Sequence, residues 1–593
     1  MSLFKIPSPK PRLSRNGFDL SSRRIFSAKA GELLPIGCWE VNPSEHFKFR
    51  IEDIVRTTTV NSAAYARMKE YYHFFFVSYR SLWQWFDQFI VGTPNPNSAL
   101  NGLNIKVANS PDYNAICESV PSFQLNELLA HLKSLKKDSQ GFDYKNGAFK
   151  LLNMLGYGNT SKGGFHSYNF LTKGSQFSHY NSDLSSDKSS FHDSGSLLTN
   201  FVCAVSPFRL LAYQKIFNDF YRVQDWSPAD VRSFNIDDFA NNSNLVISKE
   251  VAASFCQMRY RPYSKDWLTS MKPTPNYDKG IFNLPDYVGA SSNTAIFRND
   301  GNSVAVKQSS SSPVTVTVND LRAAFALDKM LEATRRANGF DYSSQIEAHF
   351  GFKVPESRAG DARFLGGFDN SIAISEVVST SKADGVNIGD VGGKGVGMMS
   401  SGQISYDVKE HGIIMCIYSV APQTEYNASY LDPFNRKLKR EQFFQPEFAD
   451  LGYQPVLSGD LLMSVRDPGY TPSSLETAAG YPKDSVETNN RLLGWQVRYN
   501  EYKTARDLVF GNFETGQNLN YWCTPRFDFG FDGDAVDKGA IKSPWSAAHF
   551  YINPGILNPI FLSDAKEVDH FMINSFFDVK AVRPMSVSGL SGL

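Results

Sequence analysis

The sequence lacks several features that mark common functional classes. Its 593 residues carry 60 basic and 60 acidic side chains, so the formal net charge is zero. A chain without a global field does not bind DNA, acidic lipid or acidic substrates indiscriminately, and any charge-driven binding must be local. No stretch approaches the roughly 20 apolar residues of a membrane span, and the N-terminus lacks the apolar core of a signal peptide. We therefore expect a soluble, unexported chain without membrane insertion.

Patterns of metal ligands are also absent. The six cysteines are scattered, with no C-x-x-C and no Cys/His cluster at zinc spacing. This spacing predicts free thiols in a reducing cytoplasm. The ten histidines never pair at i and i+4, and we interpret His73, inside an aromatic run, as a satisfied core histidine. We expect no metal and no cofactor.

Catalytic signatures are missing as well. The sequence contains neither G-x-S-x-G nor H-E-x-x-H. The run "GDVGGKGVGMMS" (389–400) lacks the first glycine of a phosphate-binding loop and has Gly395 where magnesium needs Ser or Thr, so we interpret it as a flexible loop. Adjacent acids such as Asp237 and Asp238 do not nominate a glycosidase, because the decisive quantity is a spatial separation of carboxylates. We predict no catalytic residues and no enzymatic activity.

What the sequence does contain is β structure. "EHFKFRIED" (45–53) alternates apolar and charged residues, which predicts a strand with one buried face and a start of β structure near residue 45. Strands recur after Gly360, including "IIMCIYSV" (413–420) and "FFDVKAV" (576–582). The aromatic run "EYYHFFFVSYRSLWQWFDQFI" (70–90) predicts a core strand that is apolar on both faces, followed by a short helix.

Long insertions interrupt this β framework. Helical spacing predicts helices over 206–222, where Ser206 would cap, and over 319–339, with a shorter helix near 123–137 inside a loop-rich region. A Ser-rich, polar segment lies between the first two helices. Long loops and helices between strands favour one elaborated β-sandwich.

Two segments concentrate basic charge. The N-terminal residues predict a flexible basic arm over 1–24, and "FNRKLKREQFFQPEF" (434–448) places cations between aromatics. Both could neutralise phosphates, and the second could add base stacking. A solvated arm and a turn with a solvated basic edge are the alternatives. The candidate DNA-facing residues are Lys5, Lys10, Arg12, Arg15, Arg23, Arg24, Arg436, Lys437, Lys439 and Arg440.

Several segments together resemble a known family. "RTTTVNSAAYARMKEYYHFFFVSYRSLW" (56–83) is similar to a block near the N-terminus of major capsid proteins of the Microviridae, the small single-stranded DNA phages, particularly the gokushovirus-like and Bacteroidetes-associated lineages. Matching blocks continue in order with "SPFRLLAYQKIFNDFYR", "MRYRPYSKDWLTSMKPTP", "FQPEFADLGYQPV" and "FFDVKAVRPM". Ser78 departs from the proline that many relatives carry, and 135–200 and 276–318 match nothing. Colinearity over nearly the whole chain makes the resemblance specific.

The resemblance implies a mainly β protein, an eight-stranded antiparallel viral jelly roll with large loop and helix insertions. It implies a structural subunit, sixty copies of which form a T=1 icosahedral shell around circular single-stranded DNA, assembled in the bacterial cytoplasm. Further implied partners are a small basic DNA-binding virion protein, a pilot protein, a scaffolding protein and a host receptor. We expect one capsid domain over 25–593, with insertions at 94–200 and 276–318. The second is our candidate for a threefold protrusion.

Subunit contacts favour aromatic side chains, so we expect Tyr79 or Trp83 at such a contact. Two other classes stay open. A β-sandwich carbohydrate-binding protein or glycosidase would be a monomer that binds or cleaves glycans. A single-stranded nucleic-acid-binding protein would bind DNA as a free subunit with a steep salt dependence.

Overall fold

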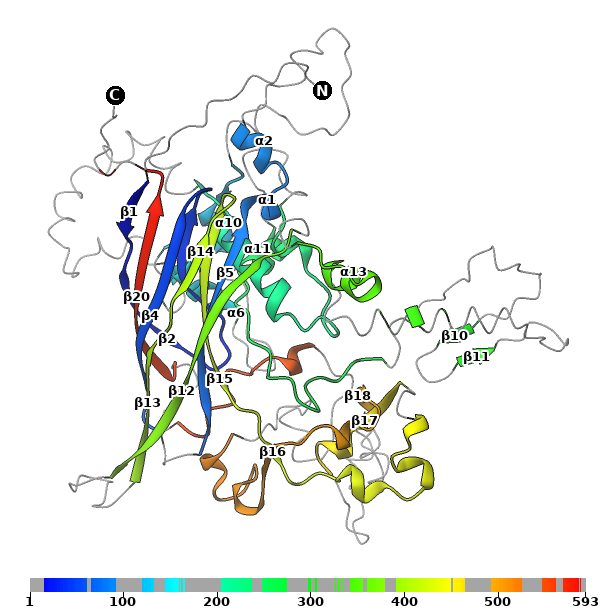
Figure 1. Ribbon diagram of the computed structural model, residues 1–593. Coiled ribbons are helices and arrows are strands. Elements are labelled where there is room, and N and C mark those ends of the chain that lie inside the picture. The colour runs from blue at the N-terminus through cyan, green and yellow to red at the C-terminus, as the bar shows by residue number, and fades with distance from the viewer. Residues whose placement is uncertain are drawn as a thin grey trace, which may run out of the picture.

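The structure is a computed structural model, and Figure 1 shows its course. It describes residues 15–60, 65–91, 120–132, 144–158, 204–236, 248–274, 342–355, 360–378, 391–448, 452–463, 492–524, 547–561 and 569–585, with isolated residues and short pieces elsewhere. Residues 1–14, most of 94–200 and 276–318, and most of the helix expected over 319–339 lie outside the described residues.

Two antiparallel sheets pack face to face. The first has the strand order β3, β15, β5, β12, and the second has the order β13, β4, β20 followed by β1 and β2, which both pair with β20. The first sheet comprises β3 (Leu34–Val41), β15 (Gly412–Pro422), β5 (Met68–Ser78) and β12 (Arg363–Val378). The second comprises β13 (Val391–Ser400), β4 (His46–Thr57), β20 (Phe571–Arg583), β1 (Asn16–Asp19) and β2 (Ser22–Ala28).

The ends of β12 and β13 pair with each other, Ala373 opposite Val396, and so join the two sheets at one corner. Because β1 and β2 share one position beside β20, the two sheets together have eight strand positions. This arrangement is the eight-stranded antiparallel jelly roll that the resemblance implied, and the predicted fold class is confirmed. A further short strand, β14 (Ile404–Asp407), also pairs with β4.

The chain is already in β structure before residue 45, and residues 16–24 form strands rather than the flexible arm that the sequence predicted. β1 and β2 already form ladders with β20, with Asn16 opposite Arg583 and Ala28 opposite Phe571. The sequence signal was weak because β2 lies at a sheet edge and exposes Arg23 and Ile25. Its pairing partner lies more than 500 residues away, beyond any local pattern.

The aromatic run forms the centre of the first sheet, as predicted. In β5, Tyr72 and Phe74 point between the sheets, whereas His73 and Phe75 point to the opposite face. The ring of Phe74 lies 4.9 Å from that of Phe49 on β4. The chain then turns helical through α1 (Tyr79–Leu82) and α2 (Phe86–Val91). A strand apolar on both faces is therefore buried on both faces.

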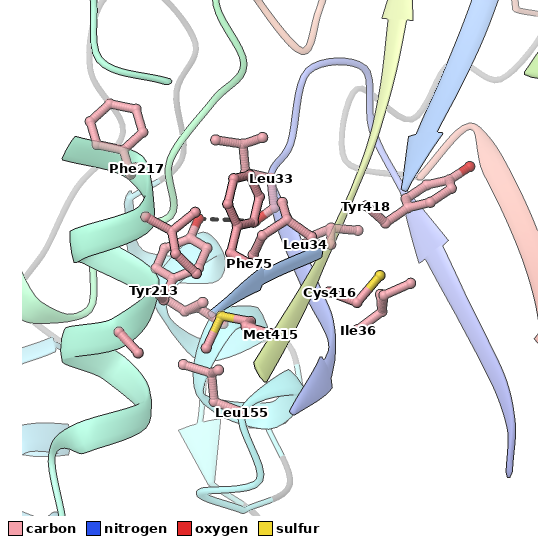
Figure 2. Packing of buried hydrophobic residues seen from close by; sticks show 14 of the residues in the cluster. Leu33, Leu34, Ile36, Phe75, Leu155, Tyr213, Phe217, Met415, Cys416 and Tyr418 are labelled. Carbon is pink, nitrogen blue, oxygen red and sulfur yellow. Dashed lines mark hydrogen bonds between the residues drawn. The ribbon is translucent and has the colours of Figure 1, made fainter. Parts of the chain in front are cut away.

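Helices cover the outer face of the first sheet. They are α5 (Leu125–Leu132), α6 (Tyr144–Met154), α10 (Phe208–Ile216), the π-helical turn Phe217–Tyr221 and α11 (Lys249–Phe255). Figure 2 shows Tyr213 of α10 among Leu33, Phe75 and Met415, with its hydroxyl donating to the carbonyl oxygen of Leu33 at 2.9 Å. In Figure 1 the helices stand on the β5 side of the sandwich, and no described element covers the outer face of β20 and β4.

The helix expected over 206–222 is confirmed as α10 and its π-helical turn. Pro207, with φ of −80°, is the N-cap, so the expected cap Ser206 is wrong by one residue. The short helix expected near 123–137 is confirmed for α5. A separate helix, α13 (Tyr342–Phe350), buries no side chain.

The glycine run over 389–400 is not a loop, contrary to the prediction, because residues 391–400 form β13. A Cβ on Gly395 would lie 2.5 Å from Cγ2 of Thr57, and the Gly395 N–H donates to the Thr57 hydroxyl at 2.7 Å. Glycine disfavours strands by propensity, but here it lets β13 approach β4 of the same sheet closely, near the corner where β13 meets β12.

A second, smaller core lies beside the sandwich. Its buried residues are Trp267, Leu268, Met271, Tyr426, Val456, Leu461, Leu493 and Phe550. Short pairs of strands frame it, namely β16 (Tyr426–Asn427) with β19 (Leu508–Val509) and β17 (Tyr453–Leu457) with β18 (Leu492–Val497). Three more short pairs occur elsewhere: β6 (Phe123–Gln124) with β9 (Ala204–Val205), β7 (Thr160–Ser161) with β8 (Gly164–Phe165), and β10 (Phe297–Asn299) with β11 (Val304–Val306).

The close approach of β15 to β5 at Gly412 can be tested by substitution. A Cβ on Gly412 of β15 would lie 2.3 Å from the backbone oxygen of Val77, so Gly412→Ala must displace a strand. We expect a loss of about 1–3 kcal/mol in the free energy of unfolding, seen as a lower urea midpoint. Gly17→Ala in β1, where nothing lies within 4 Å, is the matched control and should leave the midpoint unchanged. Equal midpoints for both variants would contradict the packing described.

Candidate functional site

Two acidic side chains lie deep between the sheets. Asp53 of β4 and Glu70 of β5 are 4% and 0% exposed. The Tyr72 hydroxyl donates to Oδ2 of Asp53 at 2.8 Å. Asn370 Nδ2 donates to Oε1 of Glu70 at 2.8 Å, and the Tyr418 hydroxyl donates to its Oε2 at 3.2 Å. Oδ1 of Asp53 is buried and has no hydrogen-bond partner in the described part of the chain.

This acid pair holds a proton at neutral pH. Burial, and then the nearby charge of Asp53, raise the pKa of Glu70 to about 8, and burial also raises the pKa of Asp53. A glycosidase needs two carboxyl groups that flank a substrate in a cleft. Aromatic rings and the two sheets enclose this pair, so no glycan can reach it, and its role is to stabilise the sandwich.

A hollow of about 300 Å³ lies beside α10 and is lined by Glu40, Tyr79, Tyr157 and Arg209 among others. Arg209 Nε donates to Oε1 of Glu40 at 3.0 Å, and the Tyr157 hydroxyl donates to the carbonyl oxygen of Ser206 at 2.6 Å. Burial raises the pKa of Glu40, although Arg209 opposes this. These polar groups of the hollow therefore hydrogen-bond to other groups of the protein. They do not form a catalytic pair of a nucleophile and a base.

Within the described residues, no group of three or more His, Cys, Asp or Glu could hold a metal ion. Cys38, Cys256, Cys416 and Cys523 are free thiols, as predicted for these four. No helix in the same part of the chain is long and apolar enough to cross a membrane.

His73 is a satisfied core histidine, as predicted. Its Nδ1 lies 2.7 Å from the Tyr221 hydroxyl. Burial and the charge of Arg261 lower the pKa of His73 to about 4, so the ring is neutral at pH 7. It is neither a ligand nor a base.

The basic segment over 434–448 folds into three short 3-10 turns, Pro433–Arg436, Arg440–Gln442 and Pro446–Phe448. Arg436 pairs with the buried Asp460. Lys437 Nζ donates to Oε1 of Glu501 at 2.8 Å and lies 4.0 Å from the centre of the Tyr502 ring. Both cations are neutralised within the chain, so the alternative of a turn held by its neighbours is correct for them. The expected DNA-facing role of Arg436 and Lys437 stays a prediction, as it does for Lys439 and Arg440, which are exposed.

The N-terminal candidates separate in a similar way. Arg23 lies on the exposed face of β2, where its Nε donates to Oδ1 of Asn574 at 2.6 Å. Arg24 points to the opposite side of β2 and is half-buried, and its expected DNA-facing role stays a prediction. Arg15 is exposed and donates to the Ser44 hydroxyl. Lys5, Lys10 and Arg12 lie outside the described residues.

The two aromatic candidates for subunit contact pack against α10. Trp83 is 2% exposed, with its ring 6.3 Å from that of Phe208, so the expected contact role is wrong for this residue. Tyr79 is half-buried, its ring is 4.7 Å from that of Phe208, and its hydroxyl bonds to Glu40. A contact role for Tyr79 stays a prediction. The tight turn after β5, which folds α1 back onto α10, explains both placements.

Sequence comparison decides the family. A model of the capsid protein (F protein) family matches residues 6–129 and 183–593. The chain belongs to this family. It is 24% identical over 299 residues to the capsid protein VP1 of Chlamydia phage 1. The aligned residues make up 47% of this chain and 43% of that relative. It is 23% identical over 217 residues to the capsid protein VP1 of Bdellovibrio phage phiMH2K, or 36% of this chain and 37% of that relative. Each alignment thus spans less than half of the relative's length.

Membership in the F-type capsid family confirms the resemblance to Microviridae capsid proteins, and the two relatives indicate a gokushovirus-like lineage. It identifies a structural protein of the virion rather than an enzyme, and so decides against the glycosidase. The buried acid pair and the engaged hollow agree with that conclusion.

The exposed face of the second sheet is a surface that the sequence reasoning missed. We call its outward side chains on β2, β20, β4 and β13, with Asp19 of β1, the bare face. Basic and apolar side chains alternate there, among them Arg56, Lys394, Met398, Met572 and Phe576. The alternation along β4 is visible in the sequence, but the neighbours across strands depend on long-range pairing.

The proton on Glu70 predicts a specific pH dependence of this capsid chain. The folded state keeps this proton up to a pKa of about 8, whereas the unfolded chain loses it near 4.5. The free energy of unfolding therefore falls as the pH rises between these values. In the wild type, the urea midpoint should be lower at about pH 8 than at about pH 7. This difference should be smaller in Glu70→Gln, because the amide stays neutral.

The exposed Glu52→Gln on β4 is the matched control and should keep the wild-type pH dependence. His73 and His570, both with pKa values near 4, do not titrate in this window in the folded chain. A wild-type midpoint that rises with pH in this window would show that Glu70 is not protonated.

Proposed function

We propose that sixty copies of this capsid protein close a T=1 icosahedral shell around circular single-stranded DNA. The observation that carries the proposal is the family match over most of the chain. A closed shell needs several different interfaces on each copy, each of modest area, so that identical chains reach completion by symmetry. Zero formal net charge favours such assembly, because like-charged subunits would repel one another.

Exposed apolar side chains outside the strands of the two sheets support association with further copies. Leu438 is 86% exposed, and Phe352, Phe443, Phe444 and Phe510 are each at least half exposed. A monomeric protein rarely leaves so many large apolar groups in water, and such groups mark interaction sites. Burial between copies would remove them from water without changing the sandwich.

The remaining partners belong to the same proposal. Lys439, Arg440 and Arg15, with Lys5, Lys10 and Arg12, are available to neutralise packaged DNA, aided by a separate small basic virion protein. A scaffolding protein would assist assembly in the bacterial cytoplasm, and a pilot protein and a host receptor would act at infection.

Electron microscopy of the purified full-length chain tests the shell. We expect uniform small icosahedral particles, because symmetric closure permits only one size for sixty identical copies. A monomer that binds glycans would instead support the carbohydrate-binding class. A monomer that binds single-stranded DNA with a steep salt dependence would support the nucleic-acid-binding class.

The Ser-rich insertion over 276–318 is our candidate for a threefold protrusion that contacts the host. Its described parts are the strands of one hairpin, β10 and β11, which Figure 1 shows well away from both sheets. The described residues of β10 and β11 belong to neither hydrophobic core, and a segment outside the cores can change without loss of the fold.

Replacement of 276–318 by a short Gly-Ser linker should therefore leave assembly intact and reduce adsorption to host cells. Particle yield by sedimentation and adsorption by plaque titration would separate the two effects. The same linker in place of 471–490, which also lies outside the described residues, is a control for replacing another segment of the chain. Particles without 276–318 that adsorb normally, or failure to assemble, would each count against the protrusion.

A further inference from the structure

We infer that the bare face is the surface of the subunit that binds the packaged single-stranded DNA, by phosphate neutralisation combined with base stacking. The inference rests on the proposed function, because it requires a shell with nucleic acid inside. Apart from Arg23, its residues are not among the DNA-facing candidates named from the sequence, because only strand pairing brings them together.

Strand register places the side chains of the bare face in rows. One row runs from Ser27 through Met572 and Arg56 to Val396. The next runs from Ile25 through Asn574 and Ile54 to Met398, and the third from Arg23 through Phe576 and Glu52 to Ser400. Neighbouring strands are about 4.8 Å apart, so these side chains form one continuous surface.

The charge of this surface is unbalanced, although the chain as a whole is neutral. Its basic members are Arg23, Lys48, Arg50, Arg56, Lys394 and Lys580, and its acidic members are Asp19, Glu52 and Asp578. Asp19 and Asp578 lie together at one end, where both pair with Lys580 at 2.6 and 3.3 Å. The half of the face around Arg56 therefore carries a net positive charge opposed only by Glu52.

Several cations of the bare face lack a counter-charge. Arg56 and Lys394 make no ion pair with any described residue, and both are exposed. Lys48 also makes no ion pair with a described residue, and it lies directly opposite Lys580, whose charge Asp19 and Asp578 offset. The phosphates of an anionic ligand would lie beside Lys48, Arg56 and Lys394.

Apolar side chains stand between these cations. Ile25 is 72% exposed, Met398 70%, Met572 48% and Phe576 43%. Charged neighbours separate them, with Phe576 flanked across the strands by Arg23 and Glu52. The core of a protein–protein interface is depleted of charge, so a protein partner fits this mixture poorly. Single-stranded nucleic acid fits it, because the phosphates meet the cations while the bases stack on apolar side chains and guanidinium planes.

The position of the helices agrees with this assignment. α10 and its π-helical turn cover the outer face of the first sheet, where Phe75 packs 4.9 Å from Phe220. The second sheet has no such cover in the described part of the chain, and its outer side chains remain in water in the isolated subunit. A shell wall with one helix-covered side and one bare, basic side is suited to a polyanion on the bare side.

Charge reversal on the bare face tests the inference. The triple variant Lys48→Glu, Arg56→Glu, Lys394→Glu changes exposed residues that make no ion pair with a described residue, so the fold should survive. We expect dissociated subunits to bind a fluorescent oligo-deoxythymidine at least tenfold more weakly. The slope of the logarithm of the binding constant against the logarithm of the salt concentration should become shallower by about 2. Three phosphate contacts are removed, and each contact on a single strand contributes about 0.7. Particles of the variant should carry less DNA, measured by the ratio of absorbance at 260 and 280 nm.

The matched control is Lys265→Glu, Lys353→Glu, Lys409→Glu, which makes the same charge change at exposed residues that lie outside the bare face and are not among the DNA-facing candidates. It should bind within about twofold of the wild type, since it removes no contact on the face. A further variant, Phe576→Ser, should weaken binding about fivefold or more without changing the salt slope, because stacking is not ionic.

Three outcomes would overturn the inference. The triple variant could keep wild-type affinity, slope and DNA content, or the control could lose as much as the triple variant. The triple variant could also remain folded, by circular dichroism and thermal midpoint, but fail to assemble, which would make the bare face a contact between subunits. If charge reversal unfolds the chain, the glutamine triple at the same positions is measured instead, with the same losses expected.

The design separates this inference from the proposed function. If the wild type forms no particles but the triple variant loses oligonucleotide binding, the proposed shell is contradicted and the proposed DNA-binding role of the bare face is supported. If the wild type forms particles and the triple variant retains its DNA, the proposed shell is supported and the proposed DNA-binding role of the bare face is contradicted.

Discussion

The insertion of β20 between β4 and β2 is the constraint on which the rest of the fold depends. Residues 571–582 pair with 46–57 on one side, and 571–577 pair with 22–28 on the other. Without β20, β4 would be an edge strand, β1 and β2 would have no partner, and the apolar side chains of the second sheet would face water. Closing a loop of more than 500 residues costs conformational entropy before the strand pairing can stabilise the fold. This pairing is therefore expected to form late in folding.

Buried polar groups fix how the elements around this pairing meet. Asp53 and Glu70 link β4 of one sheet to β5 of the other through tyrosine hydroxyls, and the shared proton avoids two adjacent buried charges. In the smaller core, the Arg506 guanidinium lies between the rings of Trp267 and Tyr430, 4.4 and 3.9 Å from their centres. Satisfied polar contacts of this kind are specific in geometry, which apolar packing alone is not.

Sequence patterns predicted those parts of the fold that have a local period. Alternation identified β4 and β20, a continuous apolar run identified β15, helical spacing identified α10, and the aromatic run identified β5 with its following helix. The patterns failed where tertiary contacts override local preference. β13 is a strand because Gly395 permits close approach, and β2 is a strand because β20 pairs with it. Lys437 looks like a surface cation in the sequence, but Glu501 and Tyr502 hold it inside. The bare face follows from register between distant strands, which no single segment encodes.

The antiparallel pairing of β1 with β20 also brings residue 16 beside residue 583. Asn16 lies opposite Arg583, and Asn16 Nδ2 donates to the carbonyl oxygen of Met585 at 2.6 Å. Adjacent segments of this kind permit a circularly permuted variant, because a short linker can join residues 16 and 585 while the chain is opened elsewhere. For engineering, a peptide fused at residue 15 and one fused at residue 585 would leave the subunit from the same edge. The order of the strands along the gene is therefore less constrained than their order in the sheet.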